Sequence, residues 1–133
     1  MRRVFADTFY FLAVLNARDL AHEQAFAFYG DAHLHLVTTE WILTEVADAN
    51  AEPARRSGFQ QLLAVLEQDD HVQVTPASHD LFRRGLRLYF DRPDKEWSLT
   101  DCISFVVMQK EGLTEALTGD KHFEQAGFVA LLK

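Results

Sequence analysis

The stretch SLTDCISFVVMQKEGLTEALTGDKHF, residues 98–123, indicates the fold class of the whole chain. Ser98 opens an apolar helical segment that runs to about Glu111, and Gly112 ends it. The residues EALTG then have the character of a short strand, after which Asp120 precedes another short helix. A helix, a strand and a helix in close succession are typical of an α/β domain.

The alternation of strands and helices continues on the N-terminal side of this stretch and beyond its end. Further short strands are expected at residues 3–6 and in the runs HLHLVTT, HVQVT and GFVALL. Helices are expected over residues 8–15, 16–30, 39–50, 54–67 and 76–90. The pattern predicts one α/β domain, residues 1–133, in which helices flank a mostly parallel sheet of about five short strands.

The composition is that of a globular protein with a core of its own. Of the 133 residues, 48% are apolar and eleven are phenylalanine, so the chain can fold without disulfides. The single cysteine, Cys102, fits a reducing, cytoplasmic setting. No apolar run approaches the roughly 20 residues that a membrane span needs, and we expect no membrane association.

The net charge of −7 bears on function in two ways. A protein that binds nucleic acid through its whole surface is usually basic, so the acidic balance taken alone argues against that function. The same balance allows some of the negative charge to gather in one pocket, where it would hold a cation.

Three aspartates are placed where ligands bind in parallel sheets, outside the carboxyl ends of the strands. Asp7 follows the first strand directly, and Asp120 follows the EALTG strand. Asp101 lies in the first turn of a helix, in the S-x-x-D spacing of a capping motif with Ser98. Each has a purely structural alternative: Asp7 as a helix cap, Asp101 as a partner of the helix dipole, and Asp120 as a turn residue.

Glu45 lies at an unusual position on its helix. At 100° per residue from Trp41, it falls at about 40°, between Trp41 and Ala49 in the apolar arc. An ionised carboxylate on a buried face costs several kcal/mol unless another group compensates its charge. An arginine would compensate it, and a metal ion shared with other carboxylates would do so equally well.

Four acids in one place would repel each other, and their pKa values would rise unless a cation joined them. Oxygen ligands favour Mg²⁺ or Mn²⁺ over zinc. None of the six histidines forms an i, i+4 pair of the kind that binds zinc on a helix. His122 lies near Asp120, either helping at the site or, as the simpler interpretation, facing solvent.

Four blocks of the sequence, in this order, resemble the PIN domain, and in particular its VapC-type toxins of toxin–antitoxin pairs. The blocks are FADTFYFLAVLN, TTEWILTEVADA, SLTDCISFVVMQKEG and ALTGDKHFEQAGF. The resemblance implies a three-layer sandwich and a Mg²⁺- or Mn²⁺-dependent endoribonuclease. The metal-binding and catalytic acids would be Asp7, Glu45, Asp101 and Asp120. Supporting hydroxyls would be those of Thr8, Ser98 and Thr118.

The resemblance also implies partners: an RNA substrate and a cognate antitoxin, with a homodimer as a further expectation. Apolar side chains in the first helices, Phe9, Phe11, Leu12 and Leu15, suggest a groove for a partner helix, a dimer surface or an ordinary core. Candidates for RNA binding, with a solvated helix surface as the alternative, are Arg55, Arg56, Arg83, Arg84, Arg87, Arg92 and Lys95.

Three other classes of protein are alternatives to this interpretation. A catalytically inactive PIN-like binding or regulatory module is the main alternative, although all four acids are present. A phosphatase of the D-x-D type is disfavoured because ADTFY lacks the second aspartate. A receiver domain is disfavoured because the start of the chain has one acid and Lys121 follows Asp120 directly. A Gly-rich phosphate loop is absent.

Overall fold

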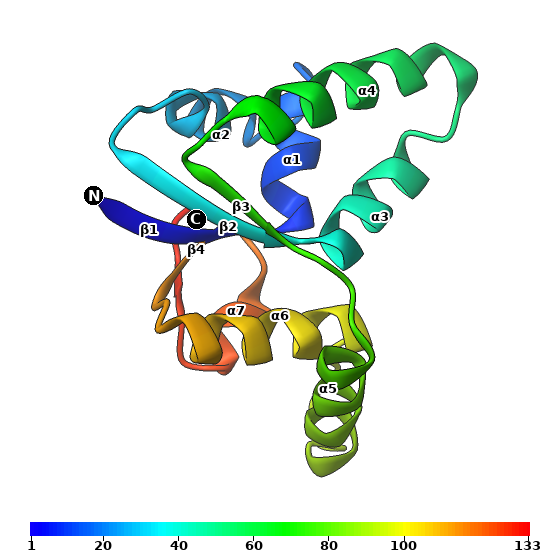
Figure 1. Cartoon of the computed structure of the whole chain (residues 1–133), viewed down its shortest axis with the longest axis vertical. Helices are drawn as coiled ribbons and strands as arrows, with labels where there is room; N and C mark the ends of the chain where they lie inside the picture. Colours follow the sequence, from blue (N-terminus) through cyan, green and yellow to red (C-terminus); the bar gives the residue numbers. More distant parts are fainter.

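The computed structural model describes residues 1–133, in which five strands and seven helices follow one another (Figure 1). The strands are β1 (Arg2–Ala6), β2 (Leu34–Thr39), β3 (Val72–Thr75), β4 (Glu115–Leu117) and β5 (Val129–Ala130). The helices are α1 (Thr8–Leu15), α2 (His22–Phe28), α3 (Glu40–Ala49), α4 (Pro53–Gln68), α5 (His79–Asp91), α6 (Leu99–Glu111) and α7 (Lys121–Gln125).

The five strands form one sheet in the order β3-β2-β1-β4-β5, and every neighbouring pair is parallel. In the β1–β4 pair, Ala6 lies opposite Leu117. The next residue of each strand, Asp7 and Thr118, therefore leaves the sheet at the same edge. This register brings together two segments more than a hundred residues apart in the chain.

Helices cover both faces of the sheet. Helices α1, α2, α3 and α4 lie on one face, α6 and α7 lie on the other, and α5 packs outside α6 (Figure 1). The predicted three-layer α/β architecture is confirmed, and the sheet is parallel throughout. No helix is both long enough and apolar enough to span a bilayer.

Phenylalanine side chains pack around the buried central strand of the sheet. Val4, Phe5 and Ala6 of β1 are fully buried, because helices cover the strand on both faces. Below it, the ring of Phe123 lies 6.2 Å from that of Phe5 and 5.0 Å from that of Phe105, the latter edge-to-face. This packing anchors α6 and α7, whose first turns carry candidate site residues.

The helix predicted over residues 16–30 is wrong in its first half. The side chain of Asn16 accepts a hydrogen bond from the Arg18 N–H, and that of Asp19 accepts one from the Ala21 N–H. These local bonds compete with helical ones and form turns, so α2 begins only at His22. The last strand is also shorter than GFVALL suggested.

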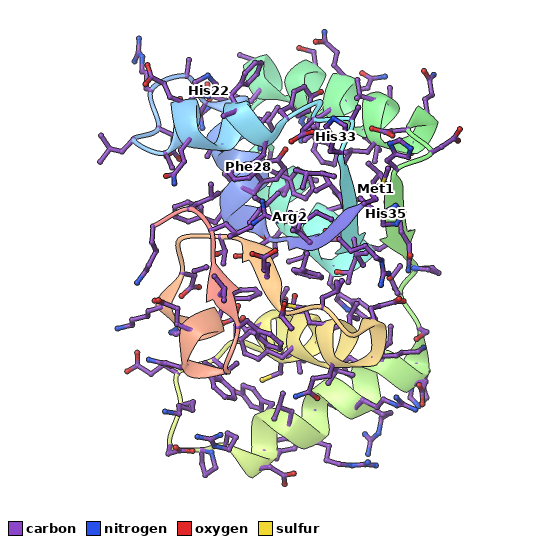
Figure 2. All side chains as sticks on the ribbon, turned by 90° about the vertical axis from the view of Figure 1, so that its left-hand side faces the viewer. Met1, Arg2, His22, Phe28, His33 and His35 are labelled. Carbon is purple, nitrogen blue, oxygen red and sulfur yellow. The ribbon has the colours of Figure 1, made fainter.

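Two other histidines lie far from the carboxyl ends of the strands. His33 and His35 lie with Met1 and Arg2 on the side where β1 and β2 begin (Figure 2). They have no part in a site at the opposite edge of the sheet.

Candidate active site

A groove of about 580 Å³ opens at the carboxyl ends of β1 and β4. All four predicted acids contribute to it, from the ends of two strands and from helices α3 and α6. Its lining residues are Asp7, Thr8, Phe9, Glu45, Glu96, Ser98, Asp101, Asp120 and His122. The site prediction therefore has a geometric basis: residues distant in sequence line one surface.

Asp7 occupies the N-cap position of α1, but its side chain makes no capping hydrogen bond. Its Oδ2 instead accepts a hydrogen bond of 2.8 Å from the Thr118 hydroxyl. Only 7% of the residue is exposed. Burial, with a smaller contribution from the charges of Asp101 and Asp120, raises the pKa of Asp7 to about 7 against the hydrogen bonds that lower it. The capping alternative does not account for this placement.

Thr118 joins two of the acids. Its hydroxyl donates to Asp7 and accepts a hydrogen bond of 3.0 Å from the Asp120 N–H. The residue is fully buried, so neither bond competes with water. Thr118 consequently fixes the Asp7 carboxylate relative to the start of α7.

Gly119, between Thr118 and Asp120, is required because a larger side chain would not fit, and not because of its backbone conformation. The φ of Gly119 is not positive, unlike that of Gly30, Gly112 and Gly127. A Cβ at Gly119 would lie 2.6 Å from Cζ of Phe9. Gly119 therefore allows the Phe9 ring to pack against the turn that carries Asp120.

Asp101 has a structural role and faces the site at the same time. Its Oδ2 accepts a hydrogen bond from the Ser98 N–H, and the Ser98 hydroxyl accepts one from the Asp101 N–H, which completes a capping box. The same Oδ2 lies 3.0 Å from Nδ1 of His122. Burial and the charge of Asp120 raise the pKa of Asp101, against the opposing effects of Ser98 and His122. Its Oδ1 makes no hydrogen bond to the protein.

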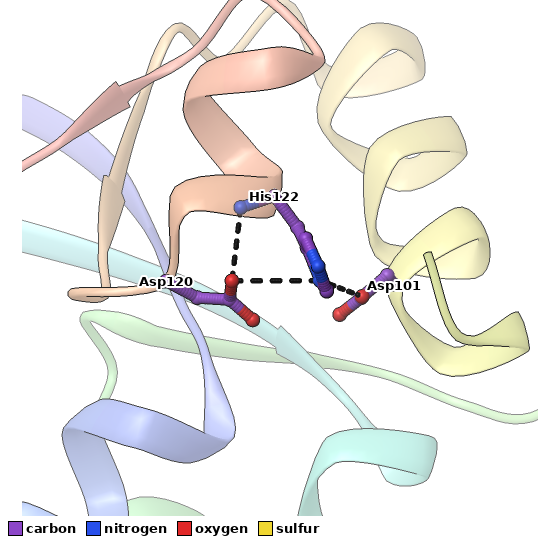
Figure 3. A group of neighbouring side chains, drawn as sticks. All are labelled: Asp101, Asp120 and His122. Carbon is purple, nitrogen blue, oxygen red and sulfur yellow. Dashed lines mark hydrogen bonds and ion pairs between the residues drawn. The ribbon is translucent and has the colours of Figure 1, made fainter. Parts of the chain in front are cut away.

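Asp120 and His122 complete a tight cluster with Asp101 (Figure 3). Oδ1 of Asp120 accepts a hydrogen bond of 2.9 Å from the His122 N–H and lies 3.4 Å from Nδ1 of the same residue. One potential ligand atom from each of the three residues lies within 4.8 Å of the others. The simpler interpretation of His122 as a solvated residue is wrong, since its side chain is only 20% exposed. The Asp-x-His spacing at a helix start was the available signal.

Glu45 lies at the margin of its helix and not inside the buried face. Ile42, Leu43 and Val46 of α3 are buried, whereas Glu45 is half-buried and Ala49 is exposed. Its Oε1 accepts a hydrogen bond of 2.6 Å from the Thr8 hydroxyl. No basic residue pairs with it, so the structural ion pair with an arginine is excluded.

Sequence reasoning missed one acid of the groove. Glu96 is exposed and lies in the polar connection between α5 and α6. It has no periodic neighbours and follows no strand, so no pattern pointed to it. It adds a fifth carboxylate to the rim.

The donor set fits a divalent cation. Buried and half-buried carboxylates face one another, and two of them, Asp7 and Asp101, have raised pKa values. A bound cation would remove this repulsion. Carboxylate oxygens with at most one imidazole suit Mg²⁺ or Mn²⁺ better than zinc, whose sites favour cysteine and histidine.

None of the seven basic candidates lines the acidic groove. Three are in ion pairs: Arg55 with Glu52, Arg84 with Asp80, and Arg92 with Asp94. Arg56 donates to the carbonyl oxygen of Ala51. The candidates whose side chains form neither an ion pair nor a hydrogen bond to the protein are Arg83, Arg87 and Lys95.

The parallel sheet, the two helical layers and the acidic groove are those of a PIN domain. The family's model matches residues 4–129, and the chain belongs to the PIN domain family. The chain is 28% identical over 128 residues to the 23S rRNA-specific endonuclease VapC20 of two Mycobacterium tuberculosis strains, CDC 1551 / Oshkosh and H37Rv, covering 95% of each chain. The crystal structure of M. tuberculosis VapC20, a sarcin–ricin loop cleaving toxin, superposes with a TM-score of 0.84 at 25% identity, covering 95% of this chain and 96% of that one.

These comparisons confirm the prediction of a PIN domain of the VapC type. The predicted class of activity, an RNA endonuclease of this type, agrees with the family and with both relatives.

Proposed function

We propose that the protein is a Mg²⁺- or Mn²⁺-dependent endoribonuclease and the toxin of a toxin–antitoxin pair. The observation that carries the metal dependence is the buried Asp7 carboxylate, which faces Asp101 and Asp120 in a groove that contains no lysine or arginine to neutralise it. Such a group is stable in its ionised form when a cation binds beside it.

The carboxylates of Asp7, Asp101 and Asp120 would hold the ion, with His122 beside them. When bound, the ion lowers the pKa of a water molecule and stabilises charge on the phosphate. Thr118 holds the Asp7 carboxylate in place through its hydroxyl, and Ser98 holds Asp101 through the capping box. The protein thus presents its ligands in fixed orientations before substrate binds.

Glu45 is the group best placed to orient the attacking water. The Thr8 hydroxyl occupies Oε1, and Oε2 makes no hydrogen bond to the protein. Oε2 can therefore accept a proton from a water in the groove. Because carboxylates repel phosphate, the RNA must be held by the cation together with basic side chains outside the groove.

We also propose two protein partners, an antitoxin and a second copy of the chain. A hollow of about 460 Å³ between α1, α3 and α4 is lined by Leu12 and Leu15 with polar neighbours, and suits a segment of an antitoxin. Phe11 is buried in the core, which is one of the alternatives that the sequence left open for these side chains. Leu20 and Phe26 are exposed apolar side chains that would suit a homodimer contact. Light scattering of the purified protein tests whether a dimer forms.

The activity can be tested on an RNA that carries a sarcin–ricin loop, the substrate of the relative. We expect cleavage with Mg²⁺ or Mn²⁺ and none with excess chelator. Asp7→Asn and Glu45→Gln are expected to be inactive, while Asp48→Asn, on the same helix as Glu45 but outside the groove, retains activity. Cleavage that persists in chelator or in Asp7→Asn would overturn the proposed site.

A further inference from the structure

A second hollow, of about 760 Å³, adjoins the acidic groove. It lies between the end of α5, which packs outside α6 at the edge of the molecule (Figure 1), and the start of α6. Glu96 and Ser98 line both the hollow and the groove. The hollow and the groove therefore adjoin, and a flexible ligand in the groove can extend toward the hollow.

Two exposed aromatic rings line this hollow. Phe90 is 69% exposed and Tyr89 is 43% exposed, and their ring centroids lie 5.5 Å apart, edge-to-face. Neither ring is needed by the core, in contrast to Trp97 of the same hollow, which is buried. Their open faces suit a flat, partly apolar ligand.

Unpaired cations flank Phe90 on both sides. Arg83 and Arg87 share a smaller hollow of about 270 Å³ with Phe90, because all three project from one face of α5 at i, i+4 and i+7. Lys95 lines the larger hollow on the other side. Arg92 is not available in the same way, since Asp94 holds it at 3.0 Å and it lies over the Trp97 ring.

We propose that Phe90 is a stacking platform for an unpaired nucleotide of the RNA substrate, next to the phosphate that is cleaved. Arg83, Arg87 and Lys95 bind the phosphates on either side of that nucleotide. Aromatic rings interleaved with cations are the common means of binding single-stranded nucleic acid. The inference rests on the proposed ribonuclease activity and adds the form of its substrate.

The surroundings favour RNA over a protein partner. Phe90 shares its two hollows with the apolar side chains of Leu86 and Tyr89 as well as with Arg83, Arg87 and Lys95. Three cations without an ion-pair partner around an exposed ring suit a polyanion better than the apolar face of a partner helix. A base in a duplex has its faces covered by its neighbours, so the platform selects a loop or a single strand.

The test compares kcat and KM of wild type and variants on one cleaved oligoribonucleotide. We expect Phe90→Leu to raise KM about tenfold with kcat little changed, within the range for loss of one stacked base. Phe90→Trp restores the wild-type KM, because it keeps an aromatic face. Val65→Ala, at an exposed apolar residue on α4 away from the hollow, is the control and leaves KM unchanged.

A second measurement tests whether the Phe90 ring contacts one particular base of the RNA. Abasic substitutions are placed one at a time beside the cleaved phosphate. At one position the substitution should raise KM for wild type but add little in Phe90→Leu, because the same contact is already lost. Phe90→Leu with an unchanged KM, or with an undiminished effect of every abasic position, would overturn the proposal.

Two further outcomes separate this inference from its alternatives. If Phe90→Leu converts a dimer to a monomer in light scattering with no change in KM, the hollow is a protein interface and the proposal fails. If the wild type cleaves no RNA under any metal, the proposed function fails first, and the inference with it.

Discussion

At the scale of single residues, the burial of Asp7 joins the stability of the protein to its proposed activity. The pKa of this carboxyl is raised to about 7, whereas an aspartate in an unfolded chain titrates near 4. Between these values the folded protein holds a proton that the unfolded chain has released. Ionising Asp7 in the metal-free protein therefore opposes folding.

The free energy of unfolding of the metal-free protein should consequently fall as the pH rises from about 4 to 7. The loss attributable to Asp7 is at most about 4 kcal/mol. Asp7→Asn should remove most of this slope and be more stable than wild type at pH 8, although inactive. Urea unfolding in chelator across this pH range measures both, and a wild-type stability that rises over the window would contradict the argument.

Thr118 offers a second test at the same scale. Thr118→Val keeps the shape of the side chain but leaves the Asp7 carboxylate and the Asp120 N–H without their partner. We expect a loss of about 1–3 kcal/mol of stability, and a lower kcat at saturating metal. Thr118→Ser keeps the hydroxyl and should stay close to wild type. Thermal unfolding and cleavage assays distinguish the variants, and a Val variant as active as Ser would show that the hydroxyl is dispensable.

At the scale of elements, the close approach of α5 and α6 depends on Gly85. A Cβ at this position would collide with the Ile103 side chain. Gly85→Ala should therefore cost about 1–3 kcal/mol despite the better helix propensity of alanine. Gly58→Ala, in α4 with its nearest neighbour 3.9 Å away, should instead stabilise by about 0.5–1 kcal/mol. Equal effects of the two substitutions on the unfolding midpoint would count against this packing.

Most of these elements could be predicted because adjacent residues determine where they begin and end. Helix α6 begins after the capping box at Ser98 and ends at the left-handed residue Gly112, and both signals depend on a few neighbouring residues. The false helical start at residues 16–21 has the same origin, since local side-chain bonds outweighed helix propensity there.

The candidate site was less accessible to sequence because it depends on packing between elements. The acids that follow strands could be placed by topology alone. The position of Glu45 at the margin of its helix depends on how α3 packs against α1, and the contact of His122 with Asp101 depends on how α7 packs against α6. Neither packing arrangement produces a periodic pattern in the sequence.

At the scale of the whole molecule, the net charge of −7 limits how RNA can be held. An acidic surface gives little general attraction to a polyanion, so binding must depend on the cation site and a few basic side chains. The unpaired cations around Phe90 are Arg83, Arg87 and Lys95. This small number predicts a weak dependence of affinity on salt.

Three phosphate contacts to a single strand correspond to a slope of about −2 when the logarithm of the binding constant is plotted against that of the salt concentration. Binding can be measured with the inactive Asp7→Asn protein at constant divalent ion. Arg87→Gln in that background should reduce the slope by about 0.7, whereas Arg84→Gln should change it little, because Arg84 is already paired with Asp80. A slope steeper than about −5 would require many more contacts than these residues provide, and would place the RNA on a different surface.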